Sequence, residues 1–126
     1  MTAGVIANAR EGGKTMHRDA IEDIVRRAYG AYAEDDRATI EALMSEDLAF
    51  TSPYDDRIGK AEYMTRCWPN HERIRAHRIE KLFIEGEEAF IRYEIETVDG
   101  QRWKNAEWMR LENGQIREVE VYFGSK

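Results

Sequence analysis

Two polar residues, Asn105 and Glu107, lie in a predicted strand over residues 103–111, two positions apart and therefore on the same face. Trp103, Met109 and Leu111 share their parity, and the last two favour burial of this set, although alternation alone leaves the choice of face open. Burial raises the pKa of a carboxyl group because desolvation disfavours its charged form, so a buried Glu107 could donate a hydrogen bond to a ligand carbonyl. Asn105 would offer an amide to the same ligand. Alternatively, Glu107 faces solvent or pairs with an arginine, and the hydrogen bonds of the Asn105 amide are satisfied by other groups of the protein core.

A second set of candidate acids, Asp55 and Asp56, lies beside Arg57. Two carboxylates in contact could polarise a water molecule, and their mutual repulsion would raise the pKa of one of them. The alternative, which we favour, is a solvated turn in which the second acid helps to neutralise Arg57, because loops are exposed and use Asp for local hydrogen bonds. If the protein is an enzyme, Tyr32 or Asp55 is the predicted catalytic partner of Glu107.

A single cysteine, Cys67, is the candidate nucleophile. It would need a base, and the nearby histidines, His71 and His77, complete no recognisable family signature with it, so a buried and unreactive thiol is the favoured interpretation. The separation of these two histidines fits neither one helical face nor a zinc motif, and His17 does not complete a set. We predict no metal site and no cofactor.

Aromatic and small polar residues are the remaining candidates for a binding pocket. Large flat side chains at these spacings could line a cavity for a flat apolar molecule, although such side chains more often fill a core. Trp68, at the end of a predicted helix, could act as a lid. The predicted pocket lining comprises Tyr29, Ser52, Tyr54, Trp68, Tyr93, Trp103, Asn105 and Phe123.

The composition limits the classes of function. The chain has 126 residues, the size of one domain, and its 42% hydrophobic and 35% charged residues support a core under a charged surface. A net charge of -6 argues against a nucleic-acid surface, which needs Lys and Arg to neutralise phosphates. No apolar run reaches the roughly 18 residues of a membrane span. With one cysteine, and therefore no internal disulfide, we expect a cytoplasmic protein.

The N-terminal part of the chain is predicted to be helical after a flexible leader over residues 1–16, which lacks periodicity and the pattern of a signal peptide. A single domain is expected over residues 17–126, and Met16 could be the true start. Apolar residues at helical spacing predict a first helix over residues 17–34. The pair Asp35 and Asp36 can cap a second, shorter helix.

The middle of the chain combines a strand, a loop and a helix. Residues 48–51 predict a short strand, which must end at Pro53 because proline cannot donate to a β-ladder. A polar loop, TSPYDDRIGK, follows. Residues 60–68 predict a third helix that stops at Pro69, since a proline disfavours helical geometry in the residue before it.

From about residue 74 to residue 122 the pattern changes to alternation, interrupted by Gly86, Gly100 and Gly114. Asp-Gly and Asn-Gly pairs are typical of two-residue hairpins, because Gly, Asn and Asp tolerate the positive φ of the turn. The segment therefore predicts four antiparallel strands. Helices followed by such a meander predict an α+β layer fold with the helices on one sheet face. The apolar residues expected to face the helices include Ala89, Ile91, Tyr93, Ile95, Val119, Val121 and Phe123.

The order of these elements carries a family resemblance over about residues 17 to 124. The segments IEALMSEDLAFTSPYDDRIGKAEYM and NAEWMRLENGQIREVEVYFG resemble the ketosteroid-isomerase-like and SnoaL-like branch of the nuclear transport factor 2-like superfamily. The resemblance implies a cone-shaped α+β fold, in which three N-terminal helices pack on a curved antiparallel sheet and enclose a pocket, often in a homodimer. It does not imply one chemistry, because relatives include isomerases, cyclases, dehydratases, epoxide hydrolases and proteins that only bind.

The resemblance also implies roles for single positions. In steroid isomerases of the family, a carboxylate before the proline of the first strand is the general base; Ser52 holds that place here, and a serine hydroxyl is not a base near neutral pH. The oxyanion-hole tyrosine of the first helix falls on Ala28, with Tyr29 one place away and Tyr32 one turn on. The strand acid that is kept protonated, so that it donates a hydrogen bond, is matched by Glu107.

These observations lead to one hypothesis and one rival. The hypothesis is a protein whose pocket binds a small, mostly apolar organic molecule, and which as an enzyme would isomerise, dehydrate or hydrolyse it without a cofactor, with Glu107 and Asn105 as polar anchors. The rival is a non-catalytic interaction module with a filled cone, which dimerises through Ala106, Trp108 and Tyr122 on the outer sheet face. A homodimer through this face is compatible with both. We expect no nucleic-acid or membrane partner.

Overall fold

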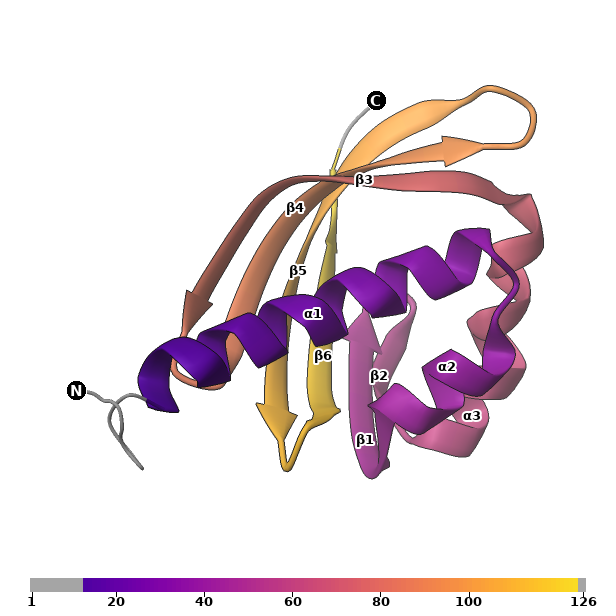
Figure 1. Ribbon diagram of the computed structural model, residues 1–126. Helices are drawn as coiled ribbons and strands as arrows, with labels where there is room; N and C mark the ends of the chain where they lie inside the picture. The colour runs from indigo at the N-terminus through magenta and orange to yellow at the C-terminus, as the bar shows by residue number, and fades with distance from the viewer. Residues whose placement is uncertain (1–12, 125–126) are drawn as a thin grey trace.

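The computed structural model of the chain describes residues 13–124, and their side chains from residue 18 onward (Figure 1). The leader predicted for residues 1–16 therefore lies mostly outside the described residues, except that residues 13–16 are helical. The elements in chain order are α1 (Gly13–Ala33), α2 (Arg37–Leu43), β1 (Met44–Ser52), β2 (Asp55–Ile58), α3 (Lys60–Arg66), the 3-10 helix η1 (Trp68–Arg73), β3 (Ile74–Glu85), β4 (Glu88–Thr97), β5 (Arg102–Glu112) and β6 (Gln115–Phe123).

The strands form one curved sheet of six strands in the order β2-β1-β6-β5-β4-β3. The sheet is mixed rather than wholly antiparallel as predicted, because β1 runs parallel to β6 while the other neighbours are antiparallel. After β2 the chain crosses through α3 and η1 to the far edge, and the meander from β3 to β6 then returns to β1. The α+β class and the placement of the helices on the concave face are confirmed (Figure 1).

Alternation identified the buried face of the central strands correctly. The predicted inward set of β4 is buried, and so are Val119 and Val121 of β6, whereas Phe123 is half-exposed at the end of its strand. On β5 the set that contains Asn105 and Glu107 faces inward, which settles the face that the sequence left open. Full burial of an aliphatic side chain stabilises the fold by roughly 1.5–3 kcal/mol. The most deeply buried side chains are Ile40, Ile91, Ile116 and Val25.

The first two helices follow the sequence prediction closely. Asp36 caps α2, because its carboxylate accepts hydrogen bonds from the Thr39 backbone N–H at 3.1 Å and from the Thr39 hydroxyl at 2.6 Å. Asp35 occupies the turn between the helices with a φ of 57°. No helix in residues 18–124 is both long and apolar enough to cross a membrane.

Two predicted boundaries in the middle of the chain are wrong. The segment predicted as a polar loop contains β2, which forms a hairpin with β1 and pairs Ser52 with Asp55. Pro69 does not end helical structure either, because it begins a second helical segment, η1. Proline is tolerated in a first turn, where its missing N–H would have no intrahelical partner.

The glycine turns lie where the sequence predicted them. Gly86, Gly100 and Gly114 have positive φ angles of 60°, 89° and 77°. Two of the three connections are two-residue turns, whereas the β4–β5 connection is longer and spans residues 98–101. These turns set the register that aligns the inward residues of neighbouring strands, including Tyr93 opposite Asn105.

Candidate functional site

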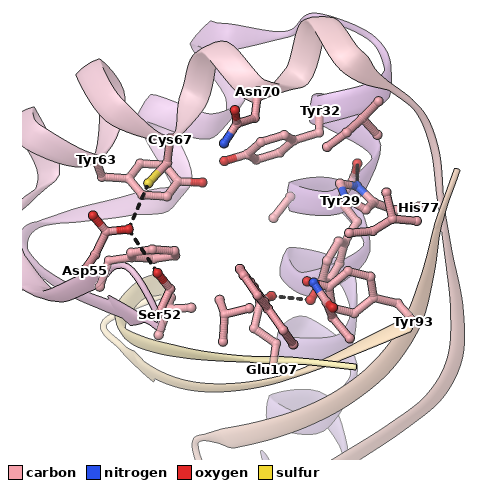
Figure 2. Close-up of a pocket in the computed structure, with 18 of the residues that line it drawn as sticks. Tyr29, Tyr32, Ser52, Asp55, Tyr63, Cys67, Asn70, His77, Tyr93 and Glu107 are labelled. Carbon is pink, nitrogen blue, oxygen red and sulfur yellow. Dashed lines mark hydrogen bonds between the residues drawn. The ribbon is translucent and has the colours of Figure 1, made fainter. Parts of the chain in front are cut away.

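A cavity of about 720 Å³ lies between the helices and the concave face of the sheet. Side chains from α1, β1, β2, α3, η1 and the four long strands line it, and Figure 2 shows many of them pointing inward. Its size matches the 300–1,000 Å³ of typical small-molecule sites. The predicted site residues that line this cavity are Tyr29, Tyr32, Ser52, Tyr54, Asp55, Tyr93, Trp103, Asn105, Glu107 and Phe123.

Glu107 is the buried carboxyl group of the cavity wall. Its residue is 8% exposed, and within residues 18–124 it forms no ion pair with a Lys, Arg or His. The Tyr29 hydroxyl donates a hydrogen bond to Glu107 Oε1 (Figure 2), and a hydrogen-bonding contact with the Tyr93 hydroxyl also lowers the pKa of this carboxyl group. Burial raises the pKa of Glu107 to about 7, although both hydrogen bonds act in the opposite direction by stabilising the charged form. At neutral pH this group can therefore either give or take a proton.

The partners of Glu107 form a connected polar group. The rings of Tyr29 and Tyr93 pack at a centroid distance of 4.8 Å. Asn105 Oδ1 accepts a hydrogen bond from the Gly124 N–H at 3.1 Å, and the Asn105 side chain also hydrogen-bonds the Tyr93 hydroxyl. Burial and then the charge of Glu107 raise the pKa of both tyrosines, so both remain neutral donors. Asn105 therefore helps to position the Tyr93 hydroxyl, and its own amide oxygen is hydrogen-bonded within the protein.

His77 completes the aromatic wall, a position that sequence reasoning missed. Its ring makes edge contacts with Tyr29, Tyr32 and Tyr93 at centroid distances of 5.2, 5.6 and 5.5 Å. Burial lowers the pKa of His77 to about 4, so the ring is neutral at pH 7 and adds no positive charge near Glu107.

Asp55 lies on the opposite wall, and its environment corrects the favoured prediction of a solvated turn. Its side chain is only 8% exposed. Its Oδ2 accepts a hydrogen bond from the Ser52 hydroxyl at 2.9 Å and lies 3.9 Å from the Cys67 sulfur (Figure 2). Its Oδ1 lies 2.8 Å from Arg66 Nη2, an ion pair in which the N–H is not aligned for a hydrogen bond. Asp55 is therefore a positioned, inward-facing carboxylate.

The two neighbouring acids do not act as a pair. Asp56 is exposed, because it follows Asp55 in a strand and its side chain points to the other side. Arg57 does not pair with Asp56 either, since it contacts Glu118 at 3.5 Å. The proposed mutual repulsion between the two aspartates therefore has no structural basis.

Cys67 is half-buried beside Asp55 and is a poor nucleophile. Burial, and then the negative charge of Asp55, raise the pKa of the thiol to about 12, which keeps it protonated. His71 stacks on Trp68 at 4.4 Å and contacts Asp35 at 3.4 Å. In the part of the chain with described side chains, no group of three or more His, Cys, Asp or Glu residues is placed to hold a metal ion.

Trp68 is the one predicted pocket residue that does not line the cavity. It is 4% exposed and packs behind Tyr32, with their ring centroids 5.0 Å apart, so it supports the wall rather than closing the mouth. Sequence reasoning also missed Tyr63 and Asn70, which do line the cavity. The most exposed lining side chains include Tyr54 at 77% and Phe123 at 49%, whose rings lie 5.5 Å apart at the rim.

Comparison with known proteins gives a consistent assignment of fold. Residues 25–119 match the model of the SnoaL-like domain. A candidate ketosteroid isomerase from Kribbella flavida is similar with a TM-score of 0.73 and 16% identity, over 86% of this chain and 80% of that chain. A candidate polyketide cyclase from Sinorhizobium meliloti gives 0.68 and 16%, over 79% and 93%. An NTF-2-like protein of unknown function from Burkholderia xenovorans gives 0.74 and 18%, over 88% of each chain. No curated protein matches the chain.

Proposed function

The chain belongs to the SnoaL-like domain family, and we propose that it binds a small, mostly apolar organic molecule with a carbonyl or hydroxyl oxygen and performs acid–base chemistry on it without a cofactor. The observation that carries this proposal is Glu107, a carboxyl group in the wall of an apolar cavity, hydrogen-bonded by Tyr29 and free of ion pairs over residues 18–124. A buried carboxyl without a cation is costly to the fold, and such groups cluster at functional sites.

Glu107 and Tyr29 support a defined mechanism. In its neutral form the carboxyl group donates a hydrogen bond to the ligand oxygen, and Tyr29 donates to the carboxyl group, which withdraws electron density from a bound carbonyl. A proton removed from a carbon atom next to that carbonyl can then be returned at another carbon, or a hydroxyl group can leave. Isomerisation and dehydration are therefore the reaction types that this arrangement favours.

Asp55 is the residue that we assign as the proton acceptor on the far wall. Ser52, at the family's usual position for the base, cannot act as a base, but it donates its hydroxyl proton to Asp55 and so orients that carboxylate. Arg66 forms an ion pair with Asp55 at 2.8 Å and so balances its charge. Tyr32 lines the helical side of the cavity, and burial raises the pKa of its hydroxyl, which therefore stays neutral.

The test uses small cyclic β,γ-unsaturated ketones as substrates, because their conjugated products absorb ultraviolet light. Wild-type protein is expected to speed the conversion, and Glu107→Gln and Asp55→Asn are each expected to reduce the rate about 100-fold or more, the usual range for an acid–base residue. Glu118→Gln, on the outer face, is the matched control. Equal rates for the wild type and both cavity variants would refute the assignment.

A second candidate role, dimerisation, is supported by an aromatic strip on the outer face. Phe83, Phe90 and Trp108 lie side by side across β3, β4 and β5, and the first two are 66% and 45% exposed. Tyr122 on β6 stacks with Phe90 at 6.5 Å and is 50% exposed. Exposed apolar patches of this kind mark interfaces.

We propose a second copy of this chain as the occupant of the strip. The charges beside the strip are already paired within the chain: Glu80 contacts Arg92 at 3.4 Å and Lys104 at 3.1 Å. An identical strip would therefore approach without strong repulsion, and a two-fold axis would place aromatic rings on aromatic rings.

Light scattering with size-exclusion chromatography tests this assembly. Wild-type protein should elute as a dimer and Phe90→Glu as a monomer. Val98→Glu, which changes a side chain that is 56% exposed in the β4–β5 turn, should remain dimeric. A monomeric wild type, or a dimeric Phe90→Glu variant, would show that the strip is not the interface.

A further inference from the structure

Three polar side chains on the helical side of the cavity make no hydrogen bond to the protein within residues 18–124. They are the hydroxyls of Tyr32 on α1 and Tyr63 on α3, and the side-chain amide of Asn70 on η1. All three line the cavity, and in Figure 2 they point into it and toward one another. We call this group the roof subsite.

The absence of partners is unusual for tyrosines in this structure. Tyr29 and Tyr93 both hydrogen-bond Glu107, and even the half-exposed Tyr122 donates to a neighbouring glutamate at 2.7 Å. Tyr63 is only 4% exposed, and its ring packs on Phe50 at 4.9 Å. The Tyr63 hydroxyl is not among the fully buried polar atoms that lack a partner in residues 18–124, so it opens to the cavity, and a phenylalanine would fill the same space without offering a polar group there. The hydroxyl is therefore better explained by a ligand than by packing.

We propose that Tyr32, Tyr63 and Asn70 bind a second oxygen group of the ligand, at the end remote from Glu107. This inference rests on the proposed function, because it describes the substrate class of the same cavity. The ligand is then a flat apolar molecule with two oxygen substituents, one held at Glu107 and the other at the roof subsite.

The charges around the roof subsite favour a neutral hydroxyl or carbonyl rather than a carboxylate. The subsite itself offers two phenols and one amide, which are neutral dipoles. The Cys67 thiol interacts with Tyr32, and the Cys67 sulfur lies 3.9 Å from Oδ2 of the Asp55 carboxylate. Arg73 lines the cavity beside the β4–β5 turn, where its backbone carbonyl accepts a hydrogen bond from the Val98 N–H at 2.8 Å. An anionic substituent at the roof subsite would exchange its water for neutral dipoles beside a carboxylate that already pairs with Arg66, at a high desolvation cost.

Naphthols provide probes that differ only in the second oxygen. We would measure Kd by fluorescence for 2-naphthol and for 2,6-, 2,7- and 1,6-dihydroxynaphthalene, each of which is 2-naphthol with one added hydroxyl at a different separation. The wild type should bind at least one dihydroxy isomer about tenfold more tightly than 2-naphthol, the effect of a well-formed hydrogen-bonded group. The double variant Tyr32→Phe/Tyr63→Phe should lose this preference while its Kd for 2-naphthol changes less than about twofold. Tyr122→Phe, outside the cavity, is the control.

A folding measurement guards against a purely structural explanation. Because the Tyr63 hydroxyl has no protein partner in residues 18–124, Tyr63→Phe should unfold at the same temperature as the wild type or higher. A preference that survives the double variant, or dihydroxy isomers that bind no better than 2-naphthol or not at all, would overturn the roof subsite. If Glu107→Gln leaves 2-naphthol binding unchanged while the double variant still removes the preference, the proposed function fails and the roof subsite stands.

Discussion

The buried Glu107 carboxyl group lowers the free energy of unfolding when it is ionised. Replacing Glu107 by glutamine should remove this pH-dependent loss of stability. Burial raises its pKa from 4.5 to about 7. Between these values the folded protein keeps a proton that the unfolded chain has lost, so the free energy of unfolding falls as the pH rises. Below about pH 4.5 both states are protonated and the cost is absent, whereas above about pH 7 both are ionised and the cost is complete. The difference between the two pKa values corresponds to about 3 kcal/mol.

Urea denaturation of the wild type and Glu107→Gln, at intervals from about pH 4 to about pH 8.5, measures this cost. Glutamine keeps the shape of the side chain and an oxygen that accepts the Tyr29 hydrogen bond, but it cannot ionise. Subtracting the two curves cancels the titration of groups that both proteins share. The stability of the variant relative to the wild type should increase by about 3 kcal/mol, mostly between about pH 4.5 and about pH 7.

A difference that stays constant over this range would refute the reasoning, because it would mean that Glu107 titrates alike in the folded and unfolded chain. A difference that falls with pH would show that Glu107 is stabilised as an anion by a partner. Glu85→Gln, an exposed position at the end of β3, gives the baseline for exchanging a carboxylate for an amide. A carbon-13 titration of the Glu107 carboxyl, assigned by its absence in Glu107→Gln, gives the pKa directly.

Two further predictions follow from the contacts of the cavity. Tyr29→Phe removes a hydrogen bond that stabilises the charged carboxylate, so the pKa of Glu107 should rise above about 7 in a carbon-13 titration; an unchanged value would show that the Tyr29 contact is not formed in solution. Cys67 should react with a disulfide reagent at pH 8 about 100-fold more slowly than the same thiol in urea, because its pKa is raised to about 12 by burial and by Asp55; equal rates would contradict its environment.

The sequence was most informative where structure depends on local patterns. Alternation on β4 and β6 identified the buried face because a strand has a period of two residues, and the Asn113-Gly114 pair identified its hairpin because both residues adopt positive φ. On β5, Met109 is a typical core residue, and Glu107 lies two positions before it on the same face, so alternation predicted that Glu107 also points inward. These features need no knowledge of the rest of the chain.

Features that depend on distant parts of the chain were missed. The parallel pairing of β1 with β6 joins segments about 70 residues apart, and no local pattern encodes it. The Asp-rich β2 resembles a loop because its stability comes from pairing with β1, as Phe50 opposite Ile58 shows. The position of His77 in the aromatic wall was obscured by a register shift after Ile79, which breaks the alternation of β3.

The Tyr29–Glu107 contact shows how the two kinds of information combine at the site. Ala28 and Tyr29 are 6% and 7% exposed, so the buried face of α1 includes both, and a helical period of 3.6 residues cannot choose between neighbours on so wide a face. The choice is made by β5, 78 residues away, where the inward parity presents a carboxyl group that only the longer side chain reaches. Sequence periodicity thus limits the site to a few residues on each element, and the packing of α1 against the sheet selects the chemical pair among them.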